Sequence, residues 1–199
     1  MTASDLLAAL DPVVAAFEAL DVPYYVGGSV ASSTHGVPRA SIDADVIAEL
    51  RPEHVAGFVS RLQSSYYVDE RRVRDAVRSR RSFNAIHLPT MFKIDVFVSK
   101  GRPFDREAMQ RARPETLDDA PGARGFRVAS PEDTVLAKLE WFRAGGEVSE
   151  RQWSDVVGVL KAAHPLLDDE HLDRWANALS VTELLVRARR DAVAGPAAK

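Results

Sequence analysis

The spacing of apolar residues changes near residue 130 and divides the chain into two parts. Before that point, short apolar or alternating runs typical of strands stand between segments with helical period. Strands are predicted over residues 23–28, 43–50, 82–88 and 91–99, and the last two form a hairpin. Helices are predicted over residues 4–20, 29–36, 52–64, 70–79 and 105–112. Pro12 is expected at a break or first turn, and most of residues 101–125 are expected to be loop.

After residue 130 only helical periodicity remains. A strong helix start stands at the change, with Ser130 in a capping position, Pro131 at the first helical position and two acids after it. Further helices are predicted, over residues 131–144, 149–163, 168–178 and 181–192. The patterns together predict an α+β fold. A mixed β-sheet flanked by helices is expected in residues 1–129, followed by a C-terminal helical region in residues 130–199.

Composition narrows the classes of protein to which the chain can belong. Of its 199 residues, 46% are apolar and 28% are charged, which is typical of a globular protein with a core. The absence of cysteine excludes disulfides, thiolate zinc sites and cysteine nucleophiles. No apolar run reaches the roughly 18 residues of a membrane span, and the first residues lack the basic segment of a secretory signal. We therefore expect a cytoplasmic protein without a membrane partner.

Charge is unevenly distributed along the chain. The net charge is −3, but residues 71–81 contain six arginines and one aspartate, so this segment carries +5 and the remainder −8. A helix over residues 70–79 places Arg71, Arg74 and Arg78 on one face. With few apolar neighbours, this helix is expected to be exposed and weakly anchored. Its arginines form either an ordinary solvated face or a surface that binds a phosphorylated acceptor.

The first candidate site is the glycine turn between the first predicted strand and the next helix. Gly27 and Gly28 permit close approach of the backbone to a ligand. The free N–H groups of the helix expected to begin at Ser29 favour an anion such as phosphate. The alternative is a tight turn in which Ser29 only caps the helix.

The second candidate site consists of aspartates on two predicted strands. Side chains alternate across a strand, so Asp43 and Asp45 lie on the same face and repel each other unless a cation or proton stands between them. Such oxygen ligands suit Mg²⁺, although a polar strand end that faces solvent explains the pair equally well. Asp95 interrupts an apolar strand, which is costly unless the carboxylate binds a metal ion or pairs with an arginine.

Two residues of the C-terminal helices are further candidates. Lys138 stands beside the apolar stripe of its helix. It either extends to water or faces a cleft, where it would neutralise a triphosphate. Asp155 follows Arg151 by four residues, so it either forms a surface ion pair on its own helix or belongs to a site.

The Gly-Ser turn, a 13-residue gap, the Asp-x-Asp pair and a later strand aspartate together resemble the signature of the polymerase-β-like nucleotidyltransferases. More closely, the run YYVGGSVASSTHGVPRASIDADV, with Arg39 before its acids, is similar to the AbiEii/AbiGii toxin-like group. That group carries a later helical lysine and an Arg/Asp pattern, matched by Lys138, Arg151 and Asp155. The resemblance covers residues 22–160 and departs from the group at Gln152 and Trp153, where many members have a basic-acidic pair.

The resemblance implies a Mg²⁺-dependent enzyme that moves a nucleoside monophosphate from an NTP to a hydroxyl acceptor and releases pyrophosphate. Asp43 and Asp45 would bridge two metal ions, and Asp95 would complete the site and help deprotonate the acceptor. The nucleotide would be held by Gly27, Gly28, Ser29, Arg39 and Lys138. The candidates for acceptor binding are Arg71, Arg74, Arg78 and Asp155.

Members of that group act as toxins of toxin–antitoxin or phage-defence systems, some of them on tRNA ends. The resemblance therefore implies an RNA or tRNA acceptor and an antitoxin protein as partners. Two alternatives remain open. One is a small-molecule adenylyltransferase of the aminoglycoside-modifying type, and the other is a catalytically silent nucleotide-binding or partner-binding module on the same fold.

Overall fold

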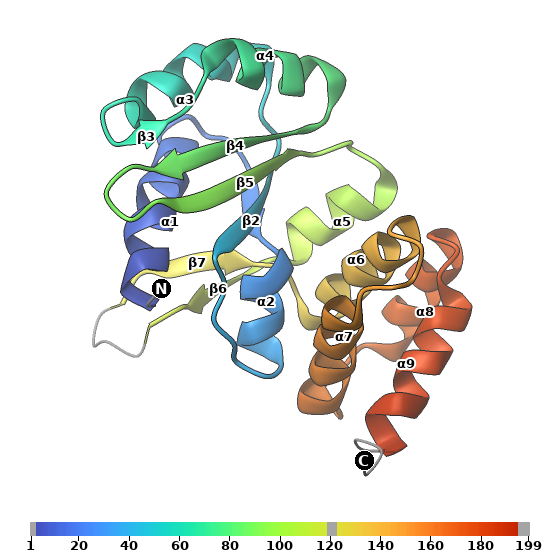
Figure 1. Cartoon of the computed structure of the whole chain (residues 1–199). Helices are drawn as coiled ribbons and strands as arrows, with labels where there is room; N and C mark the ends of the chain where they lie inside the picture. The colour runs from blue at the N-terminus through green and yellow to red at the C-terminus, as the bar shows by residue number, and fades with distance from the viewer. Residues whose placement is uncertain (1–2, 119–122, 195–199) are drawn as a thin grey trace. The chain divides into compact units, whose positions relative to one another are not determined.

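The computed structural model of the protein describes residues 3–118 and 123–194 and divides into two compact units, whose elements are labelled in Figure 1. The first unit comprises Met1–Val30 and Ala40–Ala129, and the second comprises Ala31–Arg39 and Ser130–Lys199. The expected α+β class is confirmed, with a mixed sheet flanked by helices and then a run of helices.

The sheet belongs to the first unit. Within the described residues it has seven strands in the order β3-β4-β5-β2-β1-β7-β6. Their bounds are β1 Tyr24–Val26, β2 Asp43–Ala48, β3 Tyr66–Tyr67, β4 Ser82–His87, β5 Phe92–Val98, β6 Arg113–Thr116 and β7 Gly125–Val128. The pairs β2–β5 and β1–β7 are parallel and the others are antiparallel, so the central strands β2 and β5 run in the same direction.

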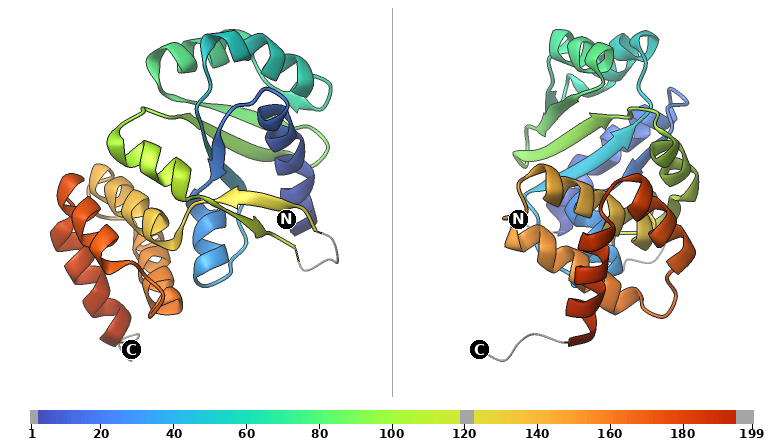
Figure 2. Two further views of the ribbon diagram at one scale, coloured as in Figure 1. Left: turned by 180° about the vertical axis from the view of Figure 1, so that it is seen from behind. Right: turned by 90° about the vertical axis from the view of Figure 1, so that its right-hand side faces the viewer.

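One face of the sheet is covered by helices and carries the core of this unit. The view from behind in Figure 2 shows α1 (Ala3–Glu18) lying across β5 and β2. Phe17 of α1 stacks on Phe58 of α3 (Val55–Leu62), with ring centroids 4.8 Å apart, and Phe58 meets Phe83 of β4 edge to face. Along β2 and β5 every second residue is buried, as the pleat of a sheet requires when one face is covered. The intermediate positions of both strands therefore lie on the opposite face.

The remaining helical elements of this unit are short. They are η1 (Pro52–His54), α4 (Glu70–Ser79), α5 (Pro103–Arg111) and the start of α2 (Gly28–His35). The expectation that α4 would be weakly anchored is wrong, because Val73, Ala76 and Val77 are buried and the helix packs on α3 and β4. These three residues form an apolar stripe at helical spacing. The stripe is easily overlooked in the sequence because most of the residues around it are charged.

Two further expectations from the sequence are wrong. The segment over residues 101–125, expected to be mostly loop, contains the strand β6 and ends at the first residue of β7, which joins the sheet beside β1. β6 is a largely exposed edge strand that contains Pro114, so it lacks the apolar alternation by which a strand is recognised. Pro12 breaks no helix, because α1 continues through it with Leu10, Val13 and Val14 fully buried on either side.

The second unit is helical, as predicted. Its helices are α6 (Pro131–Ala144), α7 (Glu150–Ala163), α8 (Asp169–Ala178) and α9 (Thr182–Ala194), drawn yellow to red in Figure 2. Helix α6 packs on α7 and α8, and α9 packs on α7, around the fully buried leucines 136, 139 and 172. Ser130 caps α6 as expected, since its Oγ accepts a hydrogen bond from the Asp133 backbone N–H at 3.1 Å. None of the helices within the described residues is long and apolar enough to cross a membrane.

Candidate functional site

The structure brings the three candidate aspartates of the sheet together on its less covered face. In the parallel register of β2 and β5, Asp45 stands beside Asp95 and Asp43 stands beside Lys93. All four residues occupy the alternate, partly exposed positions of their strands. Three carboxylates and one ammonium group therefore occupy four neighbouring positions at the centre of the sheet.

Lys93 balances part of this negative charge. Its Nζ lies 2.7 Å from Asp95 Oδ2 and 3.8 Å from Asp43 Oδ2. The hydrogen bond to Asp95, against the opposing effect of burial, raises the pKa of Lys93 and keeps it protonated. The ion pair that the sequence offered as the structural alternative for Asp95 is thus present, with a lysine in place of an arginine.

The glycine turn lies directly against these acids. Gly28 is the first residue of α2 and has a φ of +55°, a conformation that favours glycine. A Cβ at this position would stand 2.6 Å from Asp45 Cγ and 2.8 Å from Asp45 Cβ. The neighbouring Gly27 donates its N–H to the Asp45 carbonyl at 2.9 Å. Glycine at position 28 is therefore required both by the backbone conformation and by the close approach to a carboxylate.

Serines link the start of α2 to the other acid of the pair. Ser29 lies inside the first turn of α2, not at its cap, because the helix begins one residue earlier than predicted. Its Oγ lies 2.7 Å from Ser41 Oγ, which in turn lies 2.8 Å from the Asp43 carbonyl and 3.1 Å from Asp43 Oδ1. This network fixes Asp43 relative to the turn. The sequence analysis did not identify Ser41 as a site residue. The only signal for it in the sequence is its position two residues before Asp43.

Asn84 is a second residue that the sequence analysis missed. It stands opposite Asp95 in the antiparallel register of β4 and β5, and its side-chain amide donates a hydrogen bond to Asp95 Oδ1. Asp95 is thereby held from two sides, by Asn84 on β4 and by Lys93 on its own strand. Asn84 is a positioning residue for this carboxylate.

We predict that Gly28→Ala lowers the free energy of unfolding more than the same change at Gly146. Both glycines have positive φ, so each substitution costs about 1–2 kcal/mol in backbone strain. Only position 28 adds an overlap, since a Cβ at Gly146 meets nothing within 4 Å. Overpacking adds about 1–3 kcal/mol, which urea unfolding of both variants will resolve. Equal losses would show that the Asp45 carboxylate moves away without cost.

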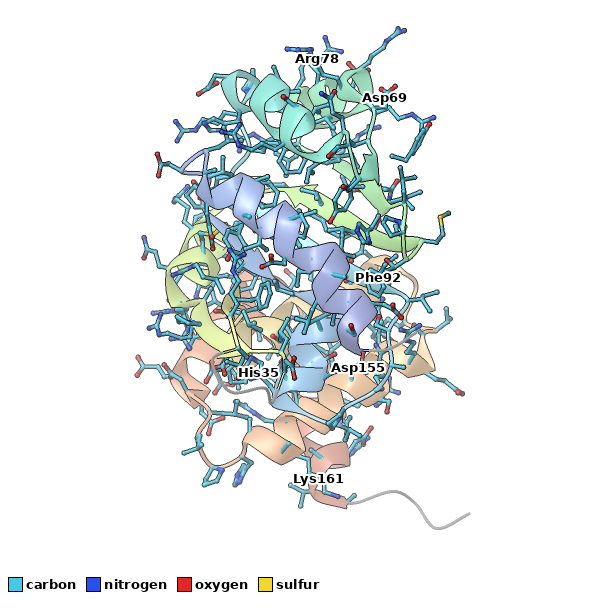
Figure 3. All side chains as sticks on the ribbon, turned by 90° about the vertical axis from the view of Figure 1, so that its left-hand side faces the viewer. His35, Asp69, Arg78, Phe92, Asp155 and Lys161 are labelled. Atoms are coloured by element: carbon cyan, nitrogen blue, oxygen red, sulfur yellow. The ribbon has the colours of Figure 1, made fainter. Side chains whose placement is uncertain are left out.

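The other candidates, Arg39, Lys138 and Asp155, form a cluster in the second unit. Arg39 donates two hydrogen bonds to Asp155, from Nε at 2.9 Å and from Nη2 at 2.7 Å. Lys138 Nζ lies 2.8 Å from Asp155 Oδ2. The side chains of Lys138 and Asp155 are 10% and 9% exposed, so Lys138 does not extend to water. Of the two alternatives for Asp155, the surface pair with Arg151 is not the one observed, because Asp155, labelled in Figure 3, pairs with Arg39 and Lys138 from other segments.

The protonation of Asp155 follows from these neighbours. Burial alone would raise its pKa, but the hydrogen bonds from Arg39 and Lys138 outweigh it and hold the pKa of Asp155 below its usual value. The carboxylate is therefore ionised at neutral pH and carries one negative charge between two positive ones.

The candidate arginines of α4 lie on its surface. Arg71, Arg74 and Arg78 are all exposed, as expected for one helix face. Two of them are paired within the helix, Arg74 with Glu70 and Arg78 with Asp75. Figure 3 shows Arg78 pointing outward from α4. Their role in acceptor binding stays a prediction from the sequence.

The carboxylates of Asp43, Asp45 and Asp95 have the chemistry that a divalent ion prefers, but they do not form an assembled ligand shell. Within residues 3–118 and 123–194, no group of three or more histidine, aspartate or glutamate residues is gathered closely enough to hold a metal ion. The donors of Asp43, Asp45 and Asp95 are nevertheless hard oxygens on adjacent positions, which Mg²⁺ prefers. The ammonium group of Lys93 already lies against two of these carboxylates, so the negative charge of the site accommodates a cation.

Comparison with known proteins relates the chain to others by fold alone. No protein-family model and no curated protein matches its sequence. Among solved structures, the chain is similar to the antibiotic-resistance factor ANT(2'')-Ia in solution, with 14% identity over 95% of this chain and 98% of the other and a TM-score of 0.57. A crystal structure of ANT(2'')-Ia with adenylyl-2''-tobramycin has 14% identity, coverage of 88% and 97%, and a TM-score of 0.55.

A third solved structure extends the likeness beyond antibiotic resistance. It is an antigenic nucleotidyltransferase-like protein from Paracoccidioides brasiliensis, with 15% identity over 94% of this chain and 93% of the other and a TM-score of 0.56. The likeness spans both units of the chain in each case. The protein thus has the fold of nucleotidyltransferases, as the Gly-Ser and Asp-x-Asp pattern led us to expect.

Proposed function

We propose that the protein is a Mg²⁺-dependent nucleotidyltransferase that transfers a nucleoside monophosphate from an NTP to a hydroxyl acceptor. The observation that carries the proposal is the contact of Gly28 with the Asp45 carboxylate, with Asp95 beside Asp45 in register. The start of α2, which in this proposal binds phosphate, therefore lies against the row of carboxylates that would bind metal ions. A purely structural turn needs no glycine in contact with an acid.

In this proposal Asp43, Asp45 and Asp95 would hold two Mg²⁺ ions, which would supply charge stabilisation of the attacking and leaving oxygens in an in-line displacement. The backbone at Gly27 and Gly28 and the first turn at Ser29 bind phosphate oxygens. Lys93 would compete with the ions for Asp95 and Asp43, because its ammonium group already lies against their oxygens.

The chemistry balances without a further reactant. The acceptor oxygen forms a bond to the α-phosphorus of the NTP, and the bond from that phosphorus to the oxygen shared with the β-phosphate breaks. Pyrophosphate leaves, and the acceptor proton passes to Asp95, which Asn84 orients. The nucleotide-binding roles of Arg39 and Lys138 remain predictions from the sequence resemblance.

A finer form of the proposal is membership of the AbiEii/AbiGii toxin-like group, with an RNA acceptor and an antitoxin partner. Its support is the run from Tyr24 to Val46 with Arg39 before the acids. Small-molecule adenylyl transfer is the second candidate, supported by the likeness of fold to ANT(2'')-Ia over nearly the whole length of both chains. The two differ in the acceptor and share the carboxylate site.

Labelled-nucleotide transfer tests the proposal. The protein is incubated with Mg²⁺ and each of the four α-labelled NTPs, once with total cellular RNA and once with a panel of small hydroxyl compounds that includes aminoglycosides. We expect label to appear in one acceptor together with release of pyrophosphate, and neither without Mg²⁺. Binding of Mg²⁺ and NTP without transfer to any acceptor would favour a catalytically silent module instead.

A further inference from the structure

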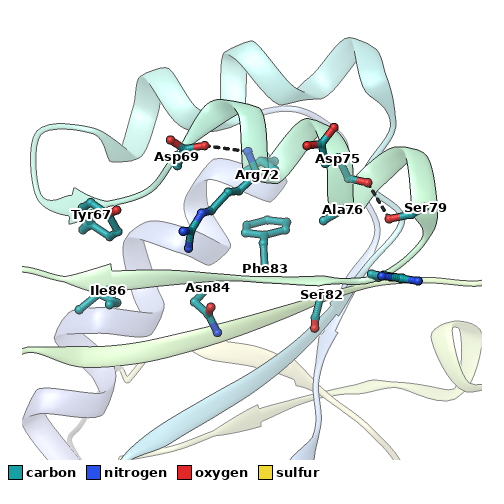
Figure 4. A pocket seen from close by; sticks show the side chains of 12 residues that line it. Tyr67, Asp69, Arg72, Asp75, Ala76, Ser79, Ser82, Phe83, Asn84 and Ile86 are labelled. Carbon is teal, nitrogen blue, oxygen red and sulfur yellow. Dashed lines mark hydrogen bonds between the residues drawn. The ribbon is translucent and has the colours of Figure 1, made fainter.

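A cavity of about 390 Å³ lies between α4 and β4 in the first unit (Figure 4). We call it the α4 pocket, and its walls include Tyr67, Arg72, Ala76, Arg81, Phe83 and Asn84. Its volume is in the range of sites for small ligands. Tyr67 and Phe83 give it an apolar wall, and the arginines give it hydrogen-bond donors.

The lining contains two arginines, Arg72 and Arg81, and two acids, Asp69 and Asp75, and the guanidinium groups of the arginines are not paired with these acids. Arg72 and Arg81 have no hydrogen-bond or ion-pair partner for their guanidinium groups among the described residues. The acids of the lining are engaged elsewhere, since Asp69 caps α4 through the Arg72 backbone N–H and Asp75 pairs with Arg78. Figure 4 shows the Arg72 side chain extending from α4 toward β4. Two free guanidinium groups at one cavity favour an anion, and planar guanidinium suits phosphate.

The α4 pocket adjoins the carboxylate site through one residue. Asn84 lines the pocket and also donates a hydrogen bond to Asp95. On the other side of Asp95 stands Asp45, which Gly28 contacts. A row across the sheet therefore runs from the pocket through Asn84 and Asp95 to the glycine turn. Asn84 therefore joins the pocket to the carboxylate that takes the acceptor proton in the proposed reaction.

We propose that the α4 pocket binds the acceptor, and that the acceptor carries a phosphate group in addition to the hydroxyl that is modified. This inference rests on the proposed nucleotidyl transfer and names its second substrate by chemistry. Arg72 and Arg81 bind the phosphate, Tyr67 and Phe83 contact the carbon skeleton, and Asn84 keeps Asp95 directed at the hydroxyl. A phosphorylated small alcohol and the terminal nucleotide of an RNA share this chemistry. A polycationic acceptor such as an aminoglycoside is disfavoured by the same arginines.

The arrangement also changes which arginines of α4 matter. Arg72, which the helical spacing alone directs away from the face of Arg71, Arg74 and Arg78, is the α4 arginine that lines the cavity. Arg51 and Arg61 are exposed arginines of the same unit that do not line it and are not candidates for acceptor binding. They are therefore controls for charge and exposure.

Binding without nucleotide tests the pocket independently of catalysis. Glycerol 3-phosphate, glycerol and a short RNA with a free 3′ hydroxyl are titrated into the full chain by calorimetry at several salt concentrations. We expect one of the phosphorylated probes to bind and glycerol not to bind. Affinity should fall about tenfold or more in Arg72→Gln and Arg81→Gln, and should stay unchanged in Arg51→Gln and Arg61→Gln. Which probe binds distinguishes a small phosphorylated acceptor from an RNA end.

The label-transfer assay then separates the two hypotheses. Normal transfer by Arg72→Gln and Arg81→Gln, with phosphate-probe binding equal to that of the wild type, would overturn the pocket and leave nucleotidyl transfer standing. Loss of probe binding in these variants, in a protein that never binds Mg²⁺ and NTP, would support the pocket as an anion site and overturn the proposed enzyme. Equal losses in the Arg51 and Arg61 controls would show general charge attraction and would also overturn the pocket.

Discussion

Asp45→Asn is expected to lower nucleotidyl transfer by more than about 100-fold while the protein stays folded. Asp45 is the central carboxylate of the row, between the glycine turn and Asp95, so in the proposed mechanism it would be a metal ligand. Loss of even an indirect partner of a metal ligand costs about 10–100-fold, and loss of a ligand costs more. Asparagine keeps the shape of the side chain and removes repulsion with Asp43, so the melting temperature should hold or rise slightly.

Two further variants make this result specific. Lys93→Met removes the ammonium group that competes for Asp95 and Asp43, so it should tighten Mg²⁺ binding measured by calorimetry, whereas Asp45→Asn should weaken it. Glu53→Gln changes an exposed acid of η1 and should alter neither Mg²⁺ binding nor transfer. Full transfer by Asp45→Asn would remove Asp45 from the metal site. Loss of its cooperative unfolding transition would assign Asp45 a structural role.

Much of the carboxylate site could be predicted from local pattern. Strand alternation alone placed Asp43 and Asp45 on one face. The hairpin predicted over residues 82–88 and 91–99 could also have revealed Asn84. Asn84 and Asp95 are equally far in sequence from the Pro89-Thr90 turn, so they pair across it. The contact between Asp45 and Asp95 could not be found in this way, since it depends on which strands become parallel neighbours in the sheet.

The features that sequence reasoning missed depend on contacts between distant segments. β6 is held by its pairing with β7 and carries almost no apolar signal of its own. Helical spacing offered Arg151 as one of two explanations of Asp155, whereas its guanidinium partner Arg39 is 116 residues away. Rules based on helical spacing consider only opposite charges that are near in sequence. Asp155 instead pairs with Lys138, which is buried beside it.

Asp155→Ala is expected to lower the free energy of unfolding by about 3–5 kcal/mol, because it leaves a buried cation without its partner. Lys138 is the group most affected, since its side chain is only 10% exposed and Asp155 is its ion-pair partner. Asp75→Ala is the matched control. It breaks an ion pair with Arg78 in which the side chains are 54% and 78% exposed, so the loss there should stay below about 1 kcal/mol. Urea unfolding of both variants at neutral pH measures the difference.

The pH dependence of the same pair gives an independent check. Because the pKa of Asp155 is held below its usual value in the folded protein, its ionised form stabilises the fold fully above the unfolded pKa of about 4. That stabilisation is lost as the pH falls through the folded pKa, where Asp155 takes up a proton and releases Arg39 and Lys138. Wild-type stability should therefore drop from about pH 5 toward pH 3 more steeply than that of Asp155→Asn, which cannot titrate. Parallel curves for the two proteins, together with a loss in Asp155→Ala no larger than in Asp75→Ala, would mean that the cluster contributes no more than an exposed ion pair.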